Sequence, residues 1–191
     1  MQINVGKYSG FCFGVRRAVE MVERLVQEGT VYTLGEIIHN RTVVDGLREK
    51  GAIPVDSVEE IPEGSRVVVR AHGVPQEVLD QCRQRNLTVF DATCPFVQKI
   101  HRIVDRESRG GRLIVVLGSA GHPEVVGIQG WCGESVVLEG EEQARAFSER
   151  PEMENKPISL VAQTTVNRSI WNISVGLIKK RCTNLKIFDT I

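Results

Sequence analysis

The stretch Leu113-Ile114-Val115-Val116-Leu117-Gly118 decides the fold. It is an unbroken apolar run rich in β-branched residues, it ends at a glycine, and a helical pattern follows at Pro123. Such a run is typical of a β-strand. Similar runs at Val31–Gly35, Arg66–Ala71 and Ile158–Ala162 alternate with helical patterns along the chain. Because strands that alternate with helices form parallel sheets with helices on both faces, the sequence predicts an α/β protein.

The chain also contains an internal repeat. Leu34-Gly35-x-x-x-His39 recurs as Leu117-Gly118-x-x-x-His122, and each copy lies where a predicted strand ends. A cysteine followed by a helical pattern precedes each copy, Cys12 before the first and Cys94 before the second. Self-similarity in this order indicates two units of the same fold.

A second repeated motif predicts where the two units begin and end. Phe90-Asp91-Ala92-Thr93 precedes Cys94, and Phe188-Asp189-Thr190-Ile191 repeats its pattern. We therefore expect an N-terminal strand segment at residues 1–11, a first α/β unit at 12–93 and a second at 94–191. A cysteine directly after Ile191 would open a third unit, so we expect two of three units around a pseudo-threefold centre, the third being absent from these residues.

Composition excludes several classes of function. Lys and Arg together number 24 and Asp and Glu together number 24, which argues against a basic nucleic-acid arm or an acidic tail. No window approaches the roughly 18 apolar residues of a membrane helix, and the N-terminus lacks the pattern of a secretory signal. We therefore expect a cytoplasmic protein. Its five cysteines, without a CxxC pair, favour neither a disulfide framework nor a zinc ribbon.

Candidate site residues follow predicted strands. Ligands of parallel α/β sheets bind beyond the carboxyl ends of the strands. The residues found there are Cys94, His39, His72, His122 and Thr164. If the units surround an axis, thiolates from different units meet at its centre, which suits an iron–sulfur cluster better than a single zinc ion. Three ligands on a four-iron cluster would leave one iron open for a substrate oxygen.

The remaining polar side chains predict a ligand and a proton source. Three histidines add hydrogen-bond donors, and positive charge when protonated, which a small anion such as a diphosphate requires. Glu124, two residues after His122, is placed for proton delivery and would be kept partly protonated by desolvation.

Each assignment has a plainer alternative. Cys82, Cys132 and Cys182 are expected to be core residues, because free cysteine is among the most buried residue types. His101 lies on an apolar helical stripe and is expected in the core. Cys12 and Cys94 are assigned as metal ligands, and the alternative for both is simple packing. His72 and His122 are alternatively loop residues, Glu124 a first-turn carboxylate, and Thr164 a helix N-cap.

Six motifs occur in an order that resembles a known family. They are Gly10-Phe11-Cys12-Phe13-Gly14-Val15, Glu36-Ile37-Ile38-His39-Asn40, Ala71-His72-Gly73-Val74, Asp91-Ala92-Thr93-Cys94-Pro95, Ala120-Gly121-His122-Pro123-Glu124 and Gln163-Thr164-Thr165. As a set they resemble the 4-hydroxy-3-methylbut-2-enyl diphosphate reductases of the non-mevalonate isoprenoid pathway. The resemblance spans essentially the whole chain, and it implies three α/β domains around a [4Fe-4S] cluster.

The resemblance also implies the reaction and the roles of residues. The reaction is a two-electron, two-proton loss of a hydroxyl group that yields isopentenyl and dimethylallyl diphosphate. Cys12 and Cys94 are implied as cluster ligands. Glu124, Thr164 and His122 are implied as the proton-delivering group, and His39, His72, His122 and Thr164 as substrate-binding residues. An external electron donor, similar to a ferredoxin or flavodoxin, is implied as the partner.

Two features depart from the family's pattern. The third cysteine ligand and the Ser-x-Asn diphosphate-binding motif are missing from these residues, so the 191-residue chain is expected to be inactive alone. Two further hypotheses are a non-catalytic iron–sulfur or metal-binding protein for electron transfer or sensing, and a phosphate-binding α/β domain without a metal. A functional requirement for Glu124 distinguishes the reductase from the electron carrier.

Overall fold

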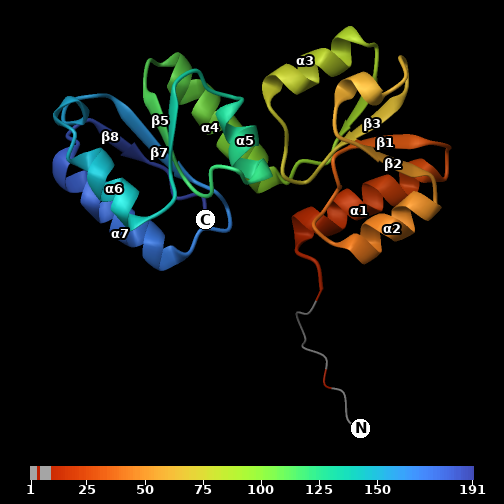
Figure 1. The fold of residues 1–191 in the computed structure, drawn as a ribbon, viewed down its shortest axis with the longest axis horizontal. Helices are drawn as coiled ribbons and strands as arrows, with labels where there is room; N and C mark the ends of the chain where they lie inside the picture. The colour runs from red at the N-terminus through yellow and green to blue at the C-terminus, as the bar shows by residue number, and fades with distance from the viewer. Residues whose placement is uncertain (1–3, 5–9) are drawn as a thin grey trace. The chain divides into compact units, whose positions relative to one another are not determined.

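The computed structural model describes residue 4 and residues 10–191 (Figure 1). Most of the strand segment expected at residues 1–11 therefore lies outside the described residues. Contacts divide the chain into two compact units. The first holds the residues up to Ala71 together with Cys82–Cys94, and the second holds His72–Gln81 together with Pro95–Ile191. The chain thus passes from the first unit to the second, returns, and passes over again.

The first unit is built on a parallel sheet with strand order β2-β1-β3-β4. The elements from Phe13 to Asp91 are α1 (Phe13–Val26), β1 (Val31–Leu34), α2 (Arg41–Glu49), β2 (Ala52–Val55), the 3-10 helix η1 (Val58–Glu60), β3 (Arg66–Val69), α3 (Gln76–Gln84) and β4 (Thr88–Asp91). Side chains of α1 and α2 share one apolar cluster with Val31 and Val68, so both helices cover the same face of the sheet (Figure 1).

Local sequence signals explain where these helices begin and end. Asn40 caps α2, because its Oδ1 accepts a hydrogen bond from Val43 N over 3.2 Å. Gly29 and Gly51 follow α1 and α2 with φ angles of 124° and 106°, a backbone region that favours glycine. Both glycines therefore stop their helices and turn the chain into the next strand.

The second unit repeats this plan with strand order β6-β5-β7-β8, again fully parallel. Its elements from Pro95 onward are α4 (Pro95–Arg109), β5 (Leu113–Leu117), α5 (Pro123–Gln129), β6 (Ser135–Leu138), α6 (Glu141–Ser148), the 3-10 helix η2 (Pro151–Met153), β7 (Ile158–Ala162), α7 (Arg168–Arg181) and β8 (Leu185–Ile187). The α/β fold with helix-flanked parallel sheets is confirmed.

Both faces of the second sheet are covered. Leu113, Val115 and Leu117 belong to an apolar cluster with α6 and α7, whereas Ile114 and Val116 belong to another with α4 and α5 (Figure 1). Alternate residues of a strand point to opposite faces of a sheet. An unbroken apolar run is therefore what a central strand between two helical layers requires.

Strand register confirms the internal repeat. Leu34 pairs with Val69 in the first sheet, and Leu117 pairs with Ala162 in the second. The repeated motif makes an equivalent side-chain to backbone hydrogen bond in both units. Thr93 N donates to Asp91 Oδ1 over 2.8 Å, and Ile191 N donates to Asp189 Oδ1 over 3.4 Å.

The strand β2 was not expected from the sequence. β2 contains Pro54, which cannot donate a backbone hydrogen bond and which argues against a central strand. In the structure β2 is an edge strand paired only with β1 among the described strands. An edge tolerates proline, because one side of the strand needs no partner.

Candidate active site

Cys12 and Cys94, the two motif cysteines, belong to the first unit. Cys12 is the exposed N-cap residue of α1, and Cys94 follows β4, with its backbone N bonded to Ala71 O over 2.9 Å. A Cβ placed on Gly14 would lie 2.6 Å from Cys94 Sγ. The Cys94 thiol therefore packs against the first turn of α1, the turn that Cys12 caps.

Hydrogen bonds fix the segment that carries Cys94. Arg17 on α1 donates from Nη1 to Thr93 O and from Nη2 to Asp91 O, each over 3.1 Å. The turn between Asp91 and Thr93 is closed by its own hydrogen bond. These contacts tie the end of β4 to α1, so the thiol of Cys94 is held in place by both elements.

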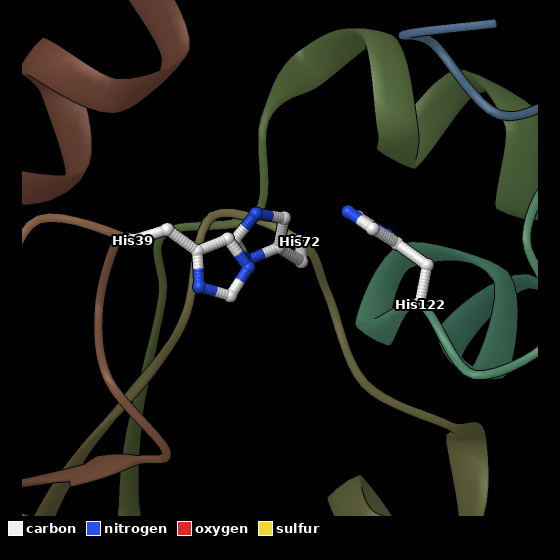
Figure 2. A group of neighbouring side chains, drawn as sticks. All are labelled: His39, His72 and His122. Atoms are coloured by element: carbon white, nitrogen blue, oxygen red, sulfur yellow. The ribbon is translucent and has the colours of Figure 1, made fainter.

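His39 lies on a loop of residues 35–40, here called the His39 loop, which follows β1. Ile37 and Ile38 are buried, and Ala71 N donates to Ile37 O over 3.4 Å. His39 itself is exposed and is labelled in Figure 2. The loop is thus anchored by its apolar residues while it presents an imidazole to solvent.

His72 and His122 are neighbours within the second unit. Their ring centroids lie 5.6 Å apart with an interplanar angle of 80° (Figure 2). His122 caps α5, and its Nδ1 accepts a hydrogen bond from Glu124 N over 3.1 Å. A neutral imidazole that accepts at Nδ1 carries its proton on Nε2. His122 can therefore offer Nε2–H to a ligand.

Glu124 and Thr164 form a hydrogen-bonded pair in which Glu124 is buried and Thr164 is half-buried. Glu124 is 3% exposed, its Oε1 accepts from Thr164 N over 2.7 Å, and its Oε2 accepts from Thr164 Oγ1 over 2.9 Å. Desolvation raises the pKa of Glu124, while both hydrogen bonds from Thr164 and the charge of His122 oppose that rise. A carboxyl group of raised pKa with a hydroxyl at 2.9 Å is well suited to donate a proton.

Gln163 supports this pair from the end of β7. Its Oε1 accepts from Ser119 N over 3.2 Å, and its Nε2 donates to Thr165 Oγ1 over 2.8 Å. A Cβ on Gly118 would lie 2.8 Å from Gln163 Cβ. Gly118 therefore lets Gln163 hold the loop that leads to His122. Sequence reasoning quoted Gln163 only within a motif and gave it no role.

The structure tests several of the alternative, non-functional interpretations of the candidate residues. Cys82, Cys182 and His101 are buried, as expected for core residues, and His101 stacks on Trp131 with centroids 5.1 Å apart. Cys132 is only half-buried. The N-cap of α7 is Asn167, so the helix-cap alternative for Thr164 was wrong. Glu124 lies in the first turn of α5 but is buried.

Across the described residues, none of the helices is long and apolar enough to cross a membrane.

Comparison with known proteins places the chain in a family. A family model described as LytB protein matches residues 3–191. The 4-hydroxy-3-methylbut-2-enyl diphosphate reductase of Clostridioides difficile is 37% identical over 196 residues, which cover 100% of this chain and 68% of that protein. The chain belongs to the LytB family, whose curated relatives are reductases of this name.

Solved structures agree with this placement. The structure of (E)-4-hydroxy-3-methyl-but-2-enyl diphosphate reductase, described as the terminal enzyme of the non-mevalonate pathway, matches with a TM-score of 0.85 at 38% identity, covering 99% of this chain and 67% of that one. The Plasmodium falciparum reductase matches with a TM-score of 0.86 at 27% identity, over 95% of this chain and 57% of that one. The chain thus spans about two thirds of its curated relatives.

Proposed function

We propose that this chain carries the proton-delivering and part of the cluster-binding machinery of a 4-hydroxy-3-methylbut-2-enyl diphosphate reductase. In this reaction two electrons and two protons remove the substrate hydroxyl as water, leaving isopentenyl or dimethylallyl diphosphate. The observation that carries the proposal is the buried Glu124 carboxyl group, hydrogen-bonded to Thr164 beside His122, in a chain of the LytB family.

Cys12 and Cys94 are the proposed ligands of a [4Fe-4S] cluster. The donor set fits in chemistry, because thiolates are the usual ligands of iron–sulfur clusters. The position of the two residues also fits, because Cys94 Sγ packs against the first turn of α1, which Cys12 caps. Gly14 has no side chain and leaves space for the thiol there. When bound, such a cluster supplies electrons and a Lewis-acidic iron for the hydroxyl group. Two thiolates hold a cluster less firmly than three, so we propose that the 191-residue chain is inactive alone.

Glu124 is the proposed proton donor. Burial keeps its carboxyl group protonated to a higher pH than in water. Thr164 Oγ1, at 2.9 Å, passes the proton onward or orients the carboxyl group toward the substrate. His122 binds the substrate through Nε2–H, because its Nδ1 already accepts the hydrogen bond from Glu124 N.

The diphosphate group is the proposed ligand of His39, His72 and His122, with Thr164 as a further donor. Imidazoles suit this task, because each offers an N–H donor and gains positive charge on protonation. The proposed electron donor is a separate carrier similar to a ferredoxin or flavodoxin.

The test uses a chimera in which the C-terminal third of the Clostridioides difficile relative follows residue 191. We expect turnover with a chemical reductant, and a loss of about 10²- to 10⁴-fold in Glu124→Gln, as for removal of a general acid. Glu142→Gln, on the exposed side of α6, is the matched control and should keep full rate. Full turnover by the Glu124→Gln chimera would contradict the proposal.

A second experiment tests the proposed cluster ligands, and the Glu124→Gln result above separates the reductase from an electron carrier. After anaerobic reconstitution, Cys12→Ser and Cys94→Ser should lose cluster absorbance, and Cys182→Ser, a change in the core, should retain it. An electron carrier would need both cysteines but would be indifferent to Glu124. Unchanged absorbance in the Cys94→Ser variant would count against the assigned ligands.

A further inference from the structure

Arg70 places a guanidinium group beneath the His39 loop. It follows β3, and its Nη1, Cζ and Cδ would lie 2.6, 3.5 and 3.6 Å from a Cβ built on Gly35. Gly35 has a φ of 70° and no side chain, so the cation packs directly against the loop backbone. Among the described residues, Arg70 Nε is buried without a hydrogen-bond partner.

The charge of Arg70 is only weakly compensated. Burial lowers the pKa of Arg70, while the charge of Asp56 at the end of β2 opposes this effect. No ion pair within 4.0 Å joins Arg70 to a carboxylate in the described part of the chain. A half-buried cation with an unused donor is costly, which makes an additional anionic partner favourable.

The equivalent position of the second unit carries an uncharged residue. Arg70 follows Val69 as Gln163 follows Ala162, and Val69 and Ala162 pair with Leu34 and Leu117 in the two sheets. Gln163 supports its loop by accepting a hydrogen bond from the loop backbone. A guanidinium has no acceptor atom, so Arg70 cannot act in this way.

The His39 loop is fixed independently of Arg70. Gly35 N donates to Val55 O over 2.8 Å, and Thr33 Oγ1 donates to Gly35 O over 2.8 Å. Ile37 O accepts from Ala71 N, directly after Arg70. The guanidinium therefore lies beside a loop that backbone hydrogen bonds hold in place.

We propose that Arg70 is a positioning residue that supplies a fixed positive charge beneath the His39 loop and so strengthens binding of the diphosphate group. The inference rests on the proposed function, in which His39 binds that group. Arg70 needs no direct contact with the ligand, because the attraction between a half-buried cation and a multiply charged anion extends over several ångströms.

The experiment measures binding of inorganic pyrophosphate to the 191-residue chain by calorimetry. We expect Arg70→Gln, which installs the residue found at the equivalent position of the second unit, to weaken binding about three- to tenfold. Arg70→Lys keeps the charge and should stay within about twofold of the wild type. Arg66→Gln, at the opposite end of β3 and paired with Glu28, is the matched control and should bind like the wild type.

Each outcome decides the inference. Equal losses in Arg70→Lys and Arg70→Gln would indicate a packing role and overturn it, as would unchanged binding by Arg70→Gln. If the wild-type chain binds no pyrophosphate, the proposed diphosphate site fails, and the role of Arg70 fails with it. Circular dichroism and thermal unfolding of each variant confirm that the fold is retained, and Arg70→Met serves as a second neutral variant.

Discussion

Thr164→Val removes one hydroxyl group and keeps the shape of the side chain. That hydroxyl donates to Glu124 Oε2 over 2.9 Å, and Glu124 is 3% exposed. A hydrogen bond to a charged group contributes about 1.5–3 kcal/mol, and one between neutral groups about 0.5–1.5 kcal/mol. We therefore expect the variant to lose about 1.5–3 kcal/mol of unfolding free energy where Glu124 is ionised, and less where it is protonated.

The sign of the pH dependence follows from the same contact. The hydroxyl stabilises the ionised carboxylate, so its loss raises the pKa of Glu124 further. The difference in stability between wild type and Thr164→Val should therefore grow as pH rises through the titration of Glu124. Urea unfolding followed by circular dichroism at a series of pH values measures this difference.

A double-mutant cycle isolates the pair. In a Glu124→Gln background, Thr164→Val should cost a smaller amount that no longer varies with pH, with a coupling energy within the usual range of about 0.5–3 kcal/mol. Thr164→Ser keeps the hydroxyl and serves as the matched control. Equal, pH-independent costs in both backgrounds would refute the reasoning, because the hydroxyl would then not interact with the carboxyl group.

Three further predictions follow from burial and space. Burial raises the pKa of Glu124 above the unfolded value near 4.5, so its contribution to stability is full below that value and is lost as pH rises through the folded pKa. Glu124→Gln should abolish this pH-dependent decline of the unfolding free energy, measured by urea unfolding. An unaltered decline in the variant would be evidence against a raised pKa of Glu124. Gly14→Ala, with a Cβ 2.6 Å from Cys94 Sγ, should lower iron incorporation during anaerobic reconstitution; wild-type iron content would show that the thiol moves freely. Gly46→Ala, in α2 with open space around its Cβ, should raise the unfolding free energy by about 0.5–1 kcal/mol, and a loss would contradict the open space.

Most of the fold was readable from the sequence, because apolar runs and helix-ending signals are local. β5 and β7 occupy the ranges expected from their apolar runs, and α4 begins at Pro95, directly after Cys94, where a helical pattern was expected. β2 was missed, because a four-residue strand with a proline is defined by its pairing with β1 and not by its own pattern. Pairing is a property of the folded chain.

The candidate site was predictable only in part. The predicted ends of the strands indicated that Glu124 and Thr164 lie at the carboxyl edge of the sheet. Their direct contact could not be predicted, because it depends on the side-chain geometry of residues 40 positions apart. The packing of Arg70 against Gly35 could not be predicted from the sequence for the same reason. The assignment of the cysteines and histidines to a cluster and a diphosphate stays a prediction.

The way in which the chain alternates between its units affects its synthesis on the ribosome. Residues 72–81 pack with the second unit, where Gly130 O accepts a hydrogen bond from Gln76 N and Trp131 Nε1 donates to Val74 O. These partners emerge about 50 residues later, which takes roughly 2.5–10 s at translation rates of 5–20 residues per second. The nascent chain therefore completes all four strands of its first sheet while this segment still waits for its partners, and in that interval a chaperone is able to bind it.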